Sequence, residues 1–187
     1  MPTKRTAGRF AAVTAGITAA VSAAAVVSAA ALARTAAPDA ARPAVAGPAC
    51  RAGALSLRLA GTDTGAGSTA LTVAIINRSA AACSLHGYPA LRLARADGSL
   101  VAARIGQGQG PLFAGLAPAA VRMRPGGRAS FFLVYRDFNP RTGRPGPAVS
   151  LLRVRLPGVA GSFTVAARFA PYGPVSVSPV RAGARPE

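Results

Sequence analysis

Hydrophobic and polar residues alternate along most of the chain from about residue 50 onward. In the segment ALSLRLA (residues 54–60), leucines occupy every second position, and Ser56 and Arg58 stand between them. A period of two is typical of half-buried antiparallel strands, which turn one side to a core and the other to solvent. The same alternation recurs in residues 70–77, 90–96, 121–125, 150–157, 162–168 and 174–180. The pattern therefore predicts an all-β domain.

One segment, ASFFLVYR (residues 129–136), replaces the alternation with a continuous apolar run. Such a run predicts a central strand covered on both sides, or a strand that lies beneath a long loop. A further short strand is expected at residues 100–105, because Asp97-Gly98 just before it is a strong hairpin signal. No segment of this region shows sustained helical periodicity with helix caps.

About eight or nine short strands, separated by turns rich in Gly and Pro, predict two antiparallel sheets packed face to face. The expected fold is an immunoglobulin-like β-sandwich, with a closed barrel as the alternative. Two connections, residues 106–118 and 137–148, are long for hairpins, and long loops often carry function in sandwiches. The glycine-rich segments 61–68 and 106–110 lack the Lys-Ser/Thr end of a phosphate loop, so they are predicted to be turns.

The N-terminus has the composition of an export signal. Three basic residues within the first nine precede an uncharged apolar run, which ends at Ala31-Leu32-Ala33 with small residues at the cleavage positions. We therefore expect a signal peptide at residues 1–33 and a secreted or cell-envelope location. An uncleaved membrane anchor is the alternative, because the run is long enough to span a bilayer.

The remaining chain divides by composition. Residues 34–49 are rich in Ala and Pro without periodicity, which predicts a disordered linker. Residues 50–180 are expected to form one β-sandwich domain, which is long enough to bury a core. Residues 181–187 are expected to be a disordered tail.

The charge balance is strongly positive, with 22 Lys and Arg against 5 Asp and Glu and a net charge of +17. Almost every basic residue is Arg, which the codon usage of a GC-rich genome explains without any selection for binding. The net charge itself favours anionic partners at ordinary ionic strength. The chain has no Trp and only three scattered Tyr, which argues against sequence-independent binding of single-stranded nucleic acid by base stacking. Specific nucleic-acid recognition is not expected either.

The chain contains two cysteines, Cys50 and Cys83. An even number in an exported chain predicts a disulfide, which would close a loop of about 34 residues and contribute roughly 3.5–4 kcal/mol. A metal or redox role is not expected without C-x-x-C spacing.

Residues that could support catalysis are scarce. His86 is the only histidine, and a hydrolase would need it beside a hydroxyl such as Ser84 or Ser99 and an oriented acid. No G-x-S-x-G motif supports this arrangement. The exported acids are few and scattered, which argues against a carboxylate pair or a calcium loop. These are Asp39, Asp63, Asp97, Asp137 and Glu187. No catalytic residue, metal site or cofactor is therefore predicted, and a hydrolase using His86 stays as the alternative.

The outward positions of the strands offer the best binding candidates. Six arginines fall there, and they could hold an anionic wall polymer, a lipid surface or extracellular nucleic acid through their guanidinium groups. These are Arg58, Arg92, Arg122, Arg124, Arg153 and Arg155. Three apolar residues of the first long loop, Leu112, Phe113 and Leu116, could contact an envelope protein or tuck back onto the core.

Several of these motifs together resemble a known family. Cys50, the segment GAGS at residues 65–68, the stretch LTVAIINRSAAACSLHGYPALRL and the later RMRPGGRASFFLVYRD resemble the actinobacterial domain of unknown function 4232. The CSLHGYP segment (residues 83–89) is the most specific part. The resemblance implies an exported β domain with a disulfide. Many members carry a second cysteine pair that this chain lacks, and no catalytic residue is established for the family.

These observations favour an exported, non-enzymatic β-sandwich module that binds an anionic envelope component or an envelope protein. A purely structural or protein-recognition domain is the other reading. The sequence specifies neither the ligand nor the oligomeric state.

Overall fold

The computed structural model of the chain describes residues 47–183, and the predicted signal peptide or anchor lies outside these residues. The described part is built from strands and two short 3₁₀ turns, Ala52–Ala54 and Pro111–Phe113. The strands are β1 (Leu55–Gly65), β2 (Ser68–Asn77), β3 (Cys83–His86), β4 (Ala90–Ala94), β5 (Leu100–Val101), β6 (Ile105–Gln107), β7 (Ala120–Met123), β8 (Arg128–Arg136), β9 (Val149–Arg155), β10 (Phe163–Phe169), β11 (Tyr172–Val177) and β12 (Arg181–Ala182). The predicted all-β class is confirmed.

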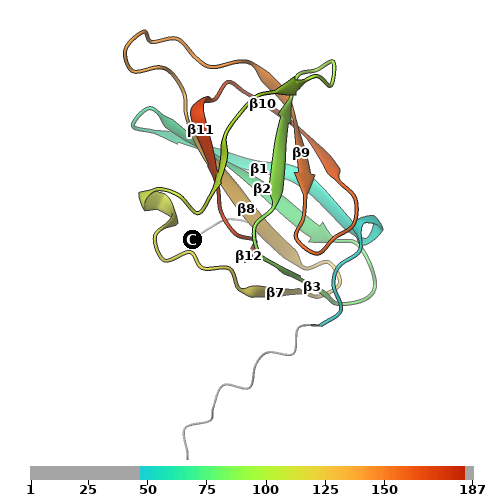
Figure 1. Cartoon of the computed structure of the whole chain (residues 1–187). Coiled ribbons are helices and arrows are strands. Elements are labelled where there is room, and N and C mark those ends of the chain that lie inside the picture. The colour runs from blue at the N-terminus through green and yellow to red at the C-terminus, as the bar shows by residue number, and fades with distance from the viewer. Residues whose placement is uncertain (1–46, 184–187) are drawn as a thin grey trace, which may run out of the picture. The chain divides into compact units, whose positions relative to one another are not determined.

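The strands form three sheets in a sandwich-like arrangement (Figure 1). The large sheet has the order β1-β2-β8-β11-β6, and β12 also pairs with β8. The smaller sheet has the order β10-β9-β4-β5, and β3 pairs with β7 in a two-stranded ribbon. Sheets with one apolar face must bury that face against another element, so these sheets share a core.

The core lies between the large and the small sheet. Its largest fully buried side chains include Ile75 and Phe131 from the large sheet and Leu93 and Leu152 from the small sheet. Ile75, Leu93 and Leu152 occupy the alternate positions that the period of two assigned to the inner faces. The alternation therefore predicted correctly which side of these alternating strands is buried.

Several details of the predicted sandwich are wrong. The structure has twelve strands within residues 47–183, where eight or nine were expected, and β6 pairs with β11 in parallel. The segment 100–105 is split between β5 and β6, and residues 106–107 belong to a strand instead of a loop. Strands of two or three residues carry too little alternation to be recognised in the sequence. The immunoglobulin-like strand arrangement stays a prediction.

The continuous apolar run of β8 is explained by its position. This strand lies between β2 and β11 in the large sheet, and its inner face contributes Phe131 and Leu133 to the core. Its outer face is covered by the connection from β6 to β7, where the ring of Phe113 stacks on that of Phe132. A strand covered on both sides, beneath a long loop, is what the run predicted.

The glycine-rich segment 61–68 is mostly strand. Residues 61–65 continue β1, which shifts register between Leu59 and Gly61, and Gly65 pairs with Ser68. Only Ala66 and Gly67 form the turn, with φ angles of 49° and 72°. Two consecutive positive φ angles are typical of the tight turns that match the twist of a hairpin. The prediction of a turn over all of 61–68 was therefore too broad.

The predicted disulfide between Cys50 and Cys83 is confirmed. Cys83 begins β3, a strand that was expected to be a connection, and faces the core with 7 % of its surface exposed. The main chain adds further links at the same place, because the Cys50 N–H donates to the Ser84 carbonyl at 3.2 Å. The disulfide and these hydrogen bonds hold the start of the domain against β3.

The folded region is slightly longer than the expected 50–180. Residues 47–49, placed in the linker, already bind β3: the Ser84 N–H donates to the Pro48 carbonyl at 2.9 Å. At the other end, Arg181 and Ala182, placed in the tail, form β12 against β8. Within residues 47–183 no helix has the length and hydrophobicity needed to cross a membrane.

Candidate functional site

Three of the six predicted arginines meet on the outer face of the small sheet. Arg92 lies on β4, and Arg153 and Arg155 lie on β9. All three are exposed, and they alternate with buried residues such as Leu93 and Val154 that point into the core. The alternation that buries the aliphatic side chains therefore turns these guanidinium groups outward.

Strand register places two of these arginines side by side. Arg92 is the direct cross-strand partner of Arg153 in the antiparallel pair of β4 and β9. Side chains at such positions have Cβ atoms about 4.5–5.5 Å apart, and like charges directly opposite each other are destabilising. The fold therefore brings two positive charges together at a position where an unlike pair would be more stable.

The same face carries a depression of about 360 Å³. Arg92, Arg153 and Arg155 line it together with Ala90, Leu91 and Ser162, and none of these described lining residues is acidic. Arg153 is partly fixed, because its Nη2 donates to the Gly98 carbonyl at 3.3 Å. Each guanidinium group offers several N–H donors in a planar fork that matches phosphate and carboxylate.

An acidic residue, Asp97, lies in the hairpin loop between β4 and β5. Its carboxylate accepts a hydrogen bond from the Ser99 N–H at 2.9 Å, and hydrogen bonds from Ser99 lower the pKa of Asp97 below its ordinary value. The carboxylate thus stabilises its own turn, while the carbonyl of the neighbouring Gly98 accepts from Arg153. The hairpin loop supports the basic face mainly through its backbone.

The other three predicted arginines lie elsewhere. Arg58 is on β1 opposite Ala74, on the outer face of the large sheet. Arg122 is on β7 opposite Ser84, and Arg124 follows in the turn before β8. All three are exposed, but they belong to different elements from the group on β4 and β9. The structure therefore brings together half of the predicted set.

The three predicted loop residues have different environments. Leu112 is 62 % exposed and Leu116 is half-buried. Phe113 is only 5 % exposed, because its side chain points from the loop toward the sheet. Of the two expected roles, contact with a partner or packing back onto the domain, Phe113 takes the second. Its side chain is therefore not available to a partner. The envelope-protein contact stays a prediction that rests mainly on Leu112.

His86 is exposed at the end of β3, opposite Ala120. The hydroxyl of Ser84, two residues earlier on the same strand, donates to the Gly47 carbonyl at 2.6 Å. Ser99 belongs to the hairpin loop described above and donates to Asp97. Among residues 47–183 no cluster of three or more His, Cys, Asp or Glu side chains is placed to hold a metal ion.

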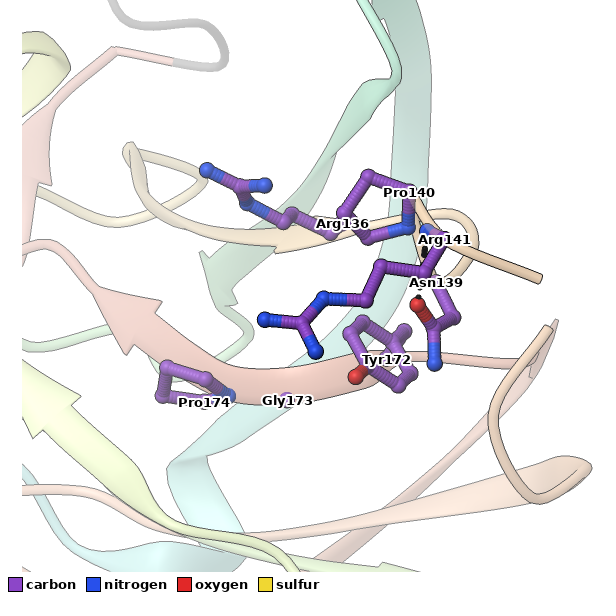
Figure 2. A pocket seen from close by; sticks show the side chains of 7 residues that line it. All are labelled: Arg136, Asn139, Pro140, Arg141, Tyr172, Gly173 and Pro174. Atoms are coloured by element: carbon purple, nitrogen blue, oxygen red, sulfur yellow. Dashed lines mark hydrogen bonds between the residues drawn. The ribbon is translucent and has the colours of Figure 1, made fainter. Parts of the chain in front are cut away.

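A second basic depression, of about 440 Å³, was missed by the sequence analysis (Figure 2). Its charged residues are Arg136 at the end of β8 and Arg141 in the following loop, and Tyr172 of β11 lies beside them. Asn139, Pro140, Gly173 and Pro174 complete the lining. The length of the loop at 137–148 was the one signal in the sequence, since nothing local indicates that Tyr172 pairs with Arg136.

The fold and these sites define a disulfide-linked all-β domain with two separate basic surfaces. The family described as Domain of unknown function (DUF4232) matches residues 50–183. The chain therefore belongs to this family, and the resemblance noted in the sequence is confirmed. No curated protein and no solved structure matches the chain.

Proposed function

We propose that this domain is an exported, non-enzymatic module that binds an anionic polymer of the cell envelope through the outer face of β4 and β9. Residues 1–33 support the export step by their composition. The observation that carries the binding step is the direct opposition of Arg92 and Arg153, with Arg155 next in line on β9.

A repeating anion is the ligand that suits this face best. Three exposed guanidinium groups on adjacent strands offer a row of positive charge, and an anion between two of them relieves the repulsion of the cross-strand pair. The three groups follow one another across two adjacent strands, so they favour an extended chain over a small molecule. A polymer with phosphodiester groups presents charges that such a row can contact in succession.

The test compares two triple variants with the same change in net charge. Arg92, Arg153 and Arg155 are replaced by Gln in one variant, and Arg58, Arg122 and Arg124 in the other. Binding of a poly(glycerol phosphate) to each protein is measured by calorimetry across a series of salt concentrations. We expect the first variant to lose about tenfold or more in affinity, because charged hydrogen bonds contribute about 1.5–3 kcal/mol each.

The control variant is expected to bind within about threefold of the wild type, because exposed charges away from the contact contribute little. Affinity of the wild type should also fall as salt rises. Equal losses in the two variants would mean that only net charge matters and would contradict a site on this face. Absence of binding at low salt would contradict the proposed function as a whole.

A further inference from the structure

The depression at the ends of β8 and β11 lies on a different sheet from the basic face of β4 and β9. Arg136 follows the inward-facing Tyr135 on β8, so its side chain points to the outer side of the large sheet. Tyr172 is its direct cross-strand partner on β11 and therefore lies on the same side. Figure 2 shows Arg141 reaching over this strand pair from the loop after β8.

The polar side chains around this depression present hydrogen-bond donors. Arg136 and Arg141 have no acceptor atoms, and the Tyr172 hydroxyl is able to donate. The side-chain oxygen of Asn139 accepts a hydrogen bond from the backbone N–H of Arg141 at 2.9 Å. The NH₂ group of the same side chain points away from this bond (Figure 2). A site lined by donors and two positive charges favours an anion.

The acidic residue next to Arg136 faces the opposite side of the sheet. The Asp137 carboxylate accepts a hydrogen bond from the Thr69 hydroxyl at 2.6 Å. Burial raises the pKa of Tyr135, and the charge of Asp137 also acts to raise it. Thr69 is the cross-strand partner of the inward-facing Tyr135, so its hydrogen bond places this carboxylate on the core side of β8, where it does not neutralise Arg136 in the depression.

The loop that carries Arg141 is held by its own hydrogen bonds. The Asn139 N–H donates to the Arg144 carbonyl, and the Gly143 N–H donates back to the Asn139 carbonyl, each at 2.8 Å. Gly146 then packs so closely on the chain before β11 that a Cβ at this position would overlap the carbonyl of Pro171. Arg141 is thus presented by a loop anchored at both ends, which lowers the cost of ordering it around a ligand.

We propose that this depression binds a single phosphate or carboxylate group carried on a small sugar-like molecule. The two guanidinium groups contact the anion, because their planar forks match the oxygens of either group. The ring of Tyr172 and the adjacent Pro140 and Pro174 line the remainder, where the carbon atoms of a sugar ring can pack. The volume of about 440 Å³ lies within the range of small-molecule sites.

The test titrates the ¹⁵N-labelled full chain with four probes, namely glucose 6-phosphate, glucuronate, inorganic phosphate and glucose. The reporters are the backbone N–H of Gly173 and the side-chain Nε–H groups of Arg136 and Arg141, observed by NMR. We expect an anionic sugar to shift these signals, and glucose to leave them unchanged. Comparison of glucose 6-phosphate with glucuronate tells whether phosphate or carboxylate is preferred.

Arg141→Gln is expected to weaken the binding of the anionic sugar about tenfold, because it removes one charged hydrogen-bonding fork. Arg144→Gln is the matched control, since it makes the same charge change in the same loop outside the lining residues. Unchanged signals from core residues such as Leu133 verify that both variants fold.

Three outcomes would overturn the inference. These are no shift at Gly173 with either anionic sugar, equal weakening in the two variants, or binding of glucose as strong as that of its phosphate. Inorganic phosphate binding as tightly as glucose 6-phosphate would overturn the contact with the sugar ring. None of these results depends on the face of β4 and β9, so the two proposals can fail separately.

Discussion

Phe113 stacks on Phe132 with 5.1 Å between the ring centroids and 15° between the ring planes. The first residue belongs to a long connection and the second to the central strand β8, so this contact fixes the loop on the outer face of the large sheet. Phe132 is 6 % exposed as a result, although it points away from the main core. The loop therefore supplies a second, smaller apolar layer.

Replacing this anchor should destabilise the domain. Phe113→Ala is expected to lower the free energy of unfolding by about 3 kcal/mol, because it removes a buried aromatic side chain and uncovers Phe132. Urea unfolding followed by tyrosine fluorescence measures the change. The adjacent Leu112→Ala is the control and should change stability by less than about 0.5 kcal/mol, since that side chain is largely exposed. Similar effects from both substitutions would contradict the anchoring role.

The disulfide should contribute a comparable amount. The double variant Cys50→Ser with Cys83→Ser is expected to be less stable by about 3–4 kcal/mol, because the bond closes a loop with a sequence separation of 33 residues. Thermal unfolding with and without a reducing agent measures this. The reducing agent should lower the melting temperature of the wild type and leave that of the double variant unchanged. Free thiols in the purified oxidised protein would contradict the prediction.

The alternation of residue types predicted the main strands because each of them contributes several residues to one core. Leu152 and Val154 on β9 show this well, since both are fully buried and the arginines next to them are exposed. The hydrophobic effect acts on single side chains, so a period of two in the sequence is enough to assign the two faces. The outward position of Arg153 follows from the same reasoning.

Other features depend on pairing between distant segments, which local patterns do not record. The parallel pair of β6 and β11 joins Ile105 to Val175, 70 residues apart, through strands too short to show a pattern. The opposition of Arg92 and Arg153 depends on the register of β4 against β9. A shift of one residue would have turned one of these side chains into the core. The arginines could therefore be assigned to an outer face but not to a common site.

The turn between β1 and β2 contains a strained residue that can be improved. Ala66 is the only described residue other than glycine with a positive φ angle, 49°. Ala66→Gly is expected to stabilise the domain by about 0.5–1 kcal/mol, because glycine adopts this conformation without steric cost. Urea unfolding is the measurement.

Gly67 provides the opposite control in the same turn. Its φ is 72°, and an added Cβ would lie 3.4 Å from the ring of Phe138. Gly67→Ala should therefore destabilise the domain by about 1 kcal/mol. If both substitutions changed stability in the same direction, the assignment of the turn to residues 66–67 would be wrong.

Asn77 is a buried polar residue that connects two turns through its side chain. It is 0 % exposed, and its Nδ2 donates to the carbonyls of Ala81 at 2.8 Å and of Met123 and Arg124 at 3.2 Å. Its Oδ1 accepts from the N–H of Ser79 at 3.0 Å and from its hydroxyl at 2.8 Å. The side chain thus links the end of β2 with the turn that leads into β8.

Asn77→Ala should therefore lower the free energy of unfolding by about 3 kcal/mol, because it removes the hydrogen bonds that this buried side chain donates to the carbonyls of Ala81, Met123 and Arg124. The hydroxyl of Ser79 makes one of these bonds and is partly exposed, so Ser79→Ala should cost only about 1 kcal/mol. Urea unfolding compares the two variants, and hydrogen exchange at the Gly126 N–H, which donates to the Asn77 carbonyl at 2.9 Å, reports on the turn itself. Exchange at Gly126 should be faster in Asn77→Ala even under conditions where the domain stays folded, because the side chain holds the turn locally. If Asn77→Ala cost no more than Ser79→Ala, the network would not be what joins these two turns.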